Sequence, residues 1–136
     1  MAWILSLWLV WILGNLALMA FVRPPDAPCF NGFRVHVPRS YLDRLTVGEW
    51  LGIYLHECGH RARGHVWKNF ILVCLFTCAS PARRTQQEFE ADDYAAARGY
   101  GRDLASALRK LGARPASAAR AERLELREEI FRLVGK

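Results

Sequence analysis

The chain begins with one long apolar stretch. Residues 2–22 carry no charged side chain, and the apolar run is interrupted only at Ser6, Gly14 and Asn15. A helix of about 20 apolar residues is long enough to cross a bilayer. A secretory signal peptide would instead begin with basic residues and have a shorter apolar core. The pattern therefore predicts an uncleaved transmembrane anchor over 1–22.

Short elements follow the anchor. The segment RPPDAP contains three prolines, which cannot continue a helix, and it indicates a stiff linker over 23–29. The remaining residues, 30–136, are numerous enough to form one domain with its own core. Within 33–37, FRVHV, apolar and polar residues alternate with the period of a half-buried strand, and Pro38 ends the pattern. A short edge strand is expected there.

Helical periodicity dominates the rest of the chain. Thr46 and Glu49 have the spacing of a capping box, and apolar residues then recur at helical intervals until Gly64. Residues 66–80 are apolar over too short a distance to span a bilayer, which favours a buried or membrane-dipping segment. Further helices are expected over 85–97, 104–111 and 117–134, and the last is expected to bury Leu126, Ile130, Leu133 and Val134. The predicted fold is mostly α (α+β), with a short edge strand or small sheet after one transmembrane helix.

Charge and cysteines bear on location. The chain has 19 Lys and Arg against 13 Asp and Glu, and the basic excess is spread along it, without interleaved stacking aromatics. This distribution favours an anionic membrane surface over nucleic acid. Basic residues follow the anchor directly, so the positive-inside rule places the domain on the cytoplasmic side, in a prokaryotic or phage-encoded inner membrane. The four cysteines are accordingly expected to be free thiols.

The segment LHECGH, 55–60, lies inside the long predicted helix. His56 and His60 are four residues apart, so both imidazoles face the same side and can bind one ion. Glu57 lies beside that ion without binding it, where it can deprotonate a zinc-activated water as general base. This HExxH pattern predicts a zinc-dependent hydrolase with one Zn²⁺ per chain.

Catalytic zinc requires a third protein ligand. A histidine six residues after His60 would supply it in one class of zinc protease, but position 66 is Val66, and His65 misses that register by one residue. The stretch QQEFEADDYAAA offers carboxylates instead, and Glu88 and Asp92 share one helical face. Glu88 is therefore assigned as the third ligand, and Asp92 as the group that accepts a hydrogen bond from a ligand histidine and fixes its tautomer.

These motifs together resemble a known family. HECGHRARGH followed by EFEADDYAAARGYGRDLASALRKL is similar to the membrane-bound zinc metallopeptidases of the HtpX and CAAX prenyl protease type, a branch of the gluzincins. The resemblance covers about 30–112 and implies a zincin-like helical metallopeptidase domain, with the roles given above for His56, Glu57, His60, Glu88 and Asp92. It also implies that His65 is not a ligand, and that FRVHVPRSYLDRLTVGE forms a strand and turn beside the cleft. Only 27 residues separate His60 from Glu88, and only one clear spanning helix is present, so the family's usual membrane-embedded elements are in doubt.

The sequence thus predicts a membrane-anchored zinc metalloendopeptidase that acts on a protein or peptide and contacts the bilayer through residues 2–22. One alternative is a regulatory peptidase of the ImmA/IrrE type, which would cleave a repressor protein by the same mechanism. Another is a non-catalytic membrane adaptor that keeps the fold, or keeps zinc for structure alone. No residue that stabilises the transition state can be matched, and His36, Tyr94 and Arg123 are the candidates for that role.

Overall fold

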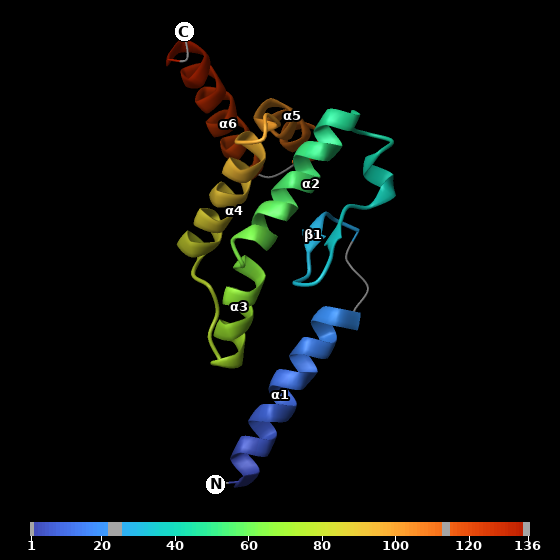
Figure 1. The fold of residues 1–136 in the computed structure, drawn as a ribbon, viewed down its shortest axis with the longest axis vertical. Helices are drawn as coiled ribbons and strands as arrows, with labels where there is room; N and C mark the ends of the chain where they lie inside the picture. Colours follow the sequence, from blue (N-terminus) through green and yellow to red (C-terminus); the bar gives the residue numbers. More distant parts are fainter. Residues whose placement is uncertain (1, 22–25, 113–114, 135–136) are drawn as a thin grey trace.

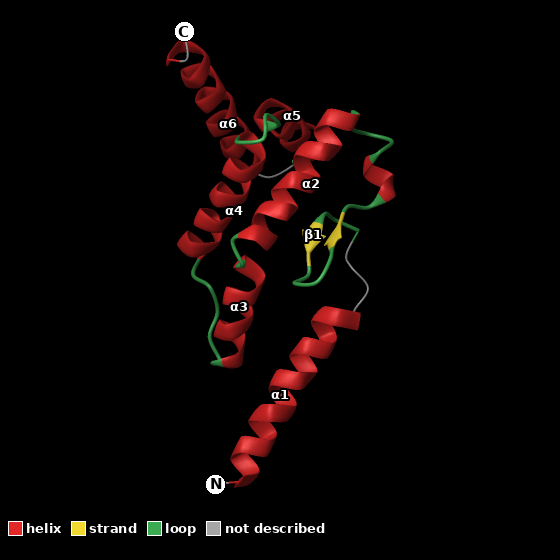
Figure 2. Ribbon diagram, in the orientation of Figure 1, coloured by secondary structure: helices red, strands yellow, loops and turns green. Residues whose placement is uncertain are grey.

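The structure, a computed structural model, describes residues 2–21, 26–112 and 115–134, and most of them are helical (Figures 1 and 2). The mostly helical fold with one small sheet confirms the coarse prediction. Part of the predicted linker, residues 23–25, lies outside the described residues. The elements are α1 (Ala2–Phe21), β1 (Cys29–Phe30), β2 (Val35–His36), the 3-10 helix η1 (Arg39–Tyr41), α2 (Val47–Ala62), α3 (His65–Cys74), α4 (Pro81–Ala96), α5 (Gly101–Leu111) and α6 (Pro115–Val134).

The sheet is a two-stranded hairpin. β1 pairs with β2 in antiparallel register, with Phe30 opposite Val35. The strand expected over 33–37 is therefore shorter than predicted, and its partner begins inside the predicted linker. The reason is the side chain of Asn31, whose Oδ1 accepts the amides of Phe33 and Arg34 at 3.0 and 2.9 Å and draws both residues into the turn.

The capping box of α2 is confirmed. The Glu49 amide donates to Thr46 Oγ1 at 3.2 Å, and the Thr46 amide donates to the Glu49 carboxylate at 2.8 Å. Glu49 is also buried, and it accepts hydrogen bonds from Ser106 and Lys110 of α5 at 2.5 and 2.8 Å. One carboxylate therefore begins α2 and fastens it to α5.

Two glycines allow α2 to lie close to its neighbours. A Cβ on Gly52 would lie 2.9 Å from the backbone nitrogen of Leu104 in α5, and one on Gly59 would lie 2.8 Å from the Cα of Ala91 in α4. Around these crossings lies the core, which α2, α4, α5 and α6 share and which includes Leu45, Ile53, Ala95, Leu104, Ala105, Ala107, Ala121 and Leu124. α2 is thus the central helix of the domain (Figure 1).

The prediction for the last helix was wrong in its buried residues. Leu126, Ile130, Leu133 and Val134 are 52–80% exposed, whereas Ala121 and Leu124 are the buried positions of α6. The two buried positions lie in the first half of α6, and the end of the helix projects beyond the other helices (Figure 1). Helical periodicity identified apolar positions, but it could not show where the neighbouring helix ends.

Glu49→Gln should lower stability at neutral pH by about 2 kcal/mol, because a buried carboxylate with three donors is replaced by a neutral amide. Burial raises the pKa of Glu49, but hydrogen bonds from Lys110, Ser106 and Thr46 outweigh it and lower the pKa to about 2. The carboxylate therefore stabilises the fold fully above its ordinary pKa of 4.5, and this contribution is lost as the pH falls toward 2.

Thermal unfolding in detergent from pH 7 to 2 tests this expectation. The wild type and Glu49→Gln should converge as the pH falls, and Glu129→Gln, the same change at an exposed position, should match the wild type throughout. A difference between the wild type and Glu49→Gln that is independent of pH would contradict it.

Candidate metal centre

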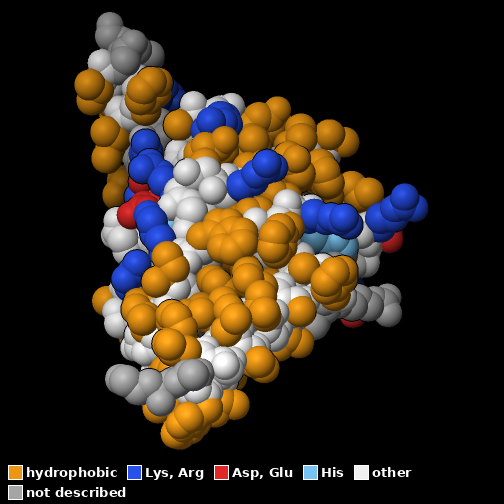
Figure 3. Space-filling view, turned by 60° about the horizontal axis from the view of Figure 1, so that its bottom comes forward, with side chains coloured by type: hydrophobic (Ala, Val, Ile, Leu, Met, Phe, Trp, Pro, Cys, Tyr) orange, Lys and Arg blue, Asp and Glu red, His pale blue; other side chains and the backbone are white. Residues whose placement is uncertain are grey.

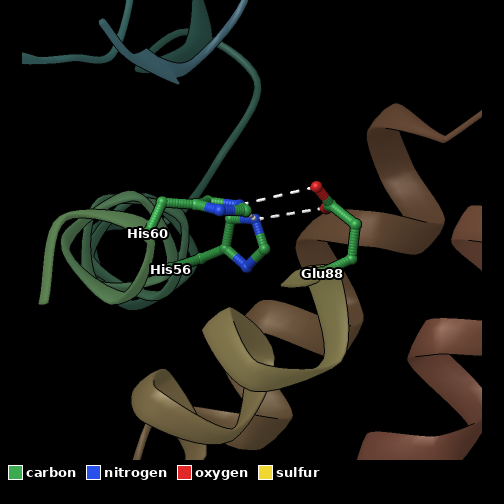
Figure 4. A group of neighbouring side chains, drawn as sticks. All are labelled: His56, His60 and Glu88. Atoms are coloured by element: carbon green, nitrogen blue, oxygen red, sulfur yellow. Dashed lines mark hydrogen bonds and ion pairs between the residues drawn. The ribbon is translucent and has the colours of Figure 1, made fainter. Parts of the chain in front are cut away.

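Three side chains from two helices converge on one point (Figure 4). His56 and His60 project from α2, and Glu88 projects from α4 toward them. The two Nε2 atoms lie 3.1 Å apart, and each lies 3.5 Å from an oxygen of Glu88. Ligand atoms about 2.0–2.1 Å from a tetrahedral ion are about 3.3 Å from one another. The three residues are therefore spaced to hold a metal ion.

The arrangement follows from the contact between α2 and α4. His56 and His60 are one helical turn apart on the side of α2 that faces α4, and Gly59 allows the two backbones to approach. On α4, Glu88 and Asp92 are also one turn apart and face α2. The helix that carries them begins at Pro81, four residues earlier than predicted, because Ser80 caps its first turn and Pro81 occupies the first helical position.

Asp92 has the contact that its predicted role requires. Its Oδ1 lies 2.9 Å from Nδ1 of His56, so the other ring nitrogen faces Glu88 and His60. Asp92 is fully buried, and the hydrogen bond orients the ring of His56.

His65 contacts the second ligand histidine in the corresponding way. Its Nδ1 lies 2.9 Å from Nδ1 of His60, and its Nε2 lies 2.9 Å from Glu90. His65 is not part of the ligand cluster, as the resemblance implied, yet it is 2% exposed and lies directly behind His60. Each ligand histidine thus has a buried partner on the nitrogen that faces away from the cluster.

Arg120 of α6 is the site residue that the sequence interpretation missed. Its guanidinium forms two hydrogen bonds with Asp92, at 2.6 and 2.9 Å, and an ion pair with Glu88 at 2.7 Å. A signal for it exists in the sequence. Arg120, Arg123 and Arg127 share one helical face and meet the acidic residues of α4, since the last two pair with Asp93.

The surroundings of the cluster shift the pKa values of the two histidines in opposite directions. Burial lowers the pKa of His56, but hydrogen bonds to Asp92 and Glu88 outweigh it and raise the pKa to about 9. Burial and, after it, the positive charge of His56 lower the pKa of His60 to about 4. Burial also raises the pKa of Asp92, but hydrogen bonds from Arg120 and His56 bring it below its ordinary value.

Glu57 lies beside the cluster on the same cavity. It is 8% exposed, and burial raises the pKa of its carboxyl group despite the nearby positive charge of His56. The backbone amide of Phe30 in β1 donates to it. The cavity has a volume of about 540 Å³, and its wall includes His56, Glu57, His60, Glu88 and Arg120 together with apolar residues of α5. A carboxylate of raised pKa and three potential ligands therefore face one shared space.

The three candidates for stabilising a transition state lie elsewhere. His36 is in β2, opposite Cys29. Tyr94 is covered by the guanidinium of Arg98 at 3.3 Å from its ring centre, and Arg123 is paired with Asp93. All three are described residues, and none of them lines the cavity, whereas Arg120 does.

No protein-family model matches the chain, and no curated protein or solved structure matches it either. The resemblance to the HtpX and CAAX prenyl protease type therefore stays a prediction. What the structure itself supplies is a His56, His60 and Glu88 group that could hold a metal ion.

Zinc binding should strengthen with pH. A metal ligand histidine must be neutral, and His56, with a pKa raised to about 9, has to release its proton. Below that pKa, one displaced proton makes apparent affinity rise about tenfold per pH unit. Competition with a chromophoric chelator at several pH values between 6 and 8.5 measures the slope. A flat profile would show that no ligand proton is displaced.

Gly59→Ala should weaken metal binding and destabilise the fold by about 1–3 kcal/mol, because its Cβ would lie 2.8 Å from the Cα of Ala91 and push α4 away from α2. Calorimetry of zinc binding and thermal unfolding give the two readouts. Cys58→Ala, at the adjacent position, is the control and should leave the zinc affinity near that of the wild type. Equal zinc affinity in Gly59→Ala and the control would contradict the expectation.

Proposed function

We propose that the protein is a membrane-anchored zinc metalloendopeptidase. The observation that carries this proposal is the ligand geometry: His56, His60 and Glu88 have the mutual spacing of three ligands around one tetrahedral ion. Two imidazoles and one carboxylate form a common ligand set of catalytic zinc, which keeps its fourth position open. Within the described residues, the cluster contains no fourth side chain.

The residues around the cluster fit hydrolysis. Zinc held there would lower the pKa of a water molecule toward neutrality and polarise a substrate carbonyl group. Glu57 would accept the proton of that water as general base and pass it to the leaving nitrogen, and its raised pKa suits both directions. The Phe30 amide would bind the carboxylate on one side.

Arg120 positions the third ligand. Its guanidinium holds Glu88 and Asp92 at once, so it connects the ligand from α4 to the residue that orients His56. The positive charge also offsets the two carboxylates, of which Asp92 is fully buried. The arginine lines the cavity, where it is close enough to the cluster to favour negative charge on a substrate oxygen.

The cavity wall suggests how a polypeptide would be held. Leu104, Leu108 and Leu111 of α5 and Ile53 of α2 form an apolar side next to the ligands, which suits an apolar side chain of a substrate. The short β-hairpin lies on the other side and offers an extended backbone edge. Both features suit the binding of an extended polypeptide.

The anchor is α1. Trp3–Phe21 is long and apolar enough to cross a membrane, and its side chains are exposed along its length. Arginines follow it in the sequence, which supports a cytoplasmic domain in a prokaryotic or phage-encoded inner membrane. The anchor argues against the ImmA/IrrE type. The three-residue cluster argues against an adaptor with structural zinc, whose fourth position would be closed by a protein ligand.

Glu57→Gln tests the proposal. The variant should retain about one zinc per chain, because Glu57 is not among the ligands, and its cleavage of an unfolded protein such as casein should fall by at least about 10²-fold. Purified protein in detergent is analysed for metal content and for cleavage products. Glu122→Gln, the same change at an exposed position of α6, should keep both properties.

Zinc bound by all three proteins without cleavage of any unfolded substrate would favour the non-catalytic adaptor. Equal cleavage by the wild type and Glu57→Gln would rule out Glu57 as the general base.

A further inference from the structure

The apolar side chains at the end of α3 face outward. Ile71, Leu75 and Phe76 are 57%, 61% and 73% exposed, and no charged residue occurs between Lys68 and Arg83. Figure 3 looks onto this end of the molecule, where hydrophobic side chains form a broad surface with Lys and Arg toward its border. An exposed apolar surface of this kind, with basic residues along part of its border, indicates a site that contacts another molecule or a membrane.

α1 lies against α3 without covering that surface. The indole nitrogen of Trp8 donates to the carbonyl oxygen of Cys74 at 3.0 Å, and the ring of Trp11 stacks on Phe76 with centroids 5.8 Å apart. With α1 in place, Ile71, Leu75 and Phe76 still have the exposed fractions given above. The apolar side chains of α1 and α3 therefore form one continuous surface, of which α1 is the part long enough to span a membrane.

The contacts fix how deep α3 would reach. Trp8 precedes Phe21 by 13 residues, which is about 20 Å along a helix at 1.5 Å per residue. If α1 crosses the bilayer, the end of α3 lies about as far from the domain side, beyond the middle of a hydrocarbon core about 30 Å thick. Lys68 precedes Cys74 by six residues, which places it about 9 Å nearer the domain side, where its long side chain can extend toward the headgroups.

The backbone amides at the end of α3 are hydrogen-bonded within the chain, as a lipid environment requires. The amide of Thr77 donates to Leu72 at 2.9 Å and that of Phe76 donates to Val73 at 3.0 Å, which is the double hydrogen bond of a Schellman ending. The amide of Leu75 donates within the helix as well, so three successive tip amides have internal acceptors. Backbone groups in hydrocarbon must be satisfied in this way.

The residue at the turn supports the same interpretation. Phe76 has a positive φ of 56°, a conformation that glycine adopts without cost and a bulky L-residue does not. Packing in the core does not offset this strain of about 1–2 kcal/mol, because the ring of Phe76 points outward onto Trp11. The ring is still 73% exposed beside Trp11, and transfer of that exposed surface to an apolar medium would lower its free energy.

From these contacts we propose that the end of α3 and the turn after it, residues 70–76, are inserted into the lipid acyl chains beside α1. The segment would form a half-membrane hairpin. The protein would then contact the bilayer through two elements, one that crosses it and one that enters from the domain side and turns back. This inference rests on the proposed membrane anchor, and the experiment below separates the two. Lipid is favoured over a second copy of the chain because the apolar surface continues directly onto the spanning helix.

Spin labels on single cysteines test the insertion in the full-length chain, reconstituted in vesicles of phosphatidylcholine and phosphatidylglycerol. The background has Cys29, Cys58, Cys74 and Cys78 replaced by alanine, and circular dichroism checks that each variant keeps its helix content. Labels are placed by Leu75→Cys in the tip and Val10→Cys in α1. Leu126→Cys on α6 is the matched control, since the leucine there is 58% exposed and that at position 75 is 61% exposed.

Oxygen partitions into lipid and a neutral nickel complex stays in water, so the two relaxation agents report the surroundings of each label. We expect oxygen to dominate at positions 75 and 10, and the nickel complex to dominate at position 126. Access of the nickel complex to position 75 but not to position 10 would overturn the insertion and leave the anchor intact. Shielding of position 75 from both agents would overturn it in favour of a protein cover, and access of the nickel complex to both positions would overturn the anchor together with the insertion.

Discussion

The close contact between α2 and α4 at Gly59 is the constraint on which the candidate site depends. Gly59 lies between the two ligand histidines, and any side chain there would collide with the backbone of Ala91. Ala91 in turn lies between Glu88 and Asp92. The point of closest approach is therefore also the centre of the ligand set, and the helices can bring imidazole and carboxylate within reach of one ion only because no Cβ separates them.

A second feature of that contact is its charge. The buried surface between α2, α4 and α6 carries His56, Asp92 and Arg120, all largely shielded from water. Buried ions are costly unless each is paired, and here every carboxylate oxygen of Asp92 meets a donor. A doubly charged ion among these ligands would add positive charge where His56 already bears a proton. A proton and a metal ion would therefore compete for the imidazole of His56.

The sequence predicted the parts of this site that lie on one helix. The spacing of His56 and His60, the capping box at Thr46, and the shared face of Glu88 and Asp92 are local properties, and the backbone periodicity determines them. Arg120 was not predicted, because its role arises from the packing of α6 across α4. The exposed end of α6 has the same origin: Leu126 and Ile130 repeat as core residues do, but none of the described helices covers their face. Local pattern determines faces, and only tertiary packing decides which faces are covered.

The β-hairpin lies between the apolar helix α1 and the candidate site. The Asn31 side chain donates to the carbonyl oxygen of Met19 near the end of α1, and Gly32 lies against Met19 and against Val66 of α3. The residue before this turn is Phe30, whose amide donates to Glu57. Through these contacts the hairpin meets α1, α3 and the carboxylate of Glu57. The turn between its strands requires Gly32, because φ there is +97°, a conformation that L side chains rarely adopt.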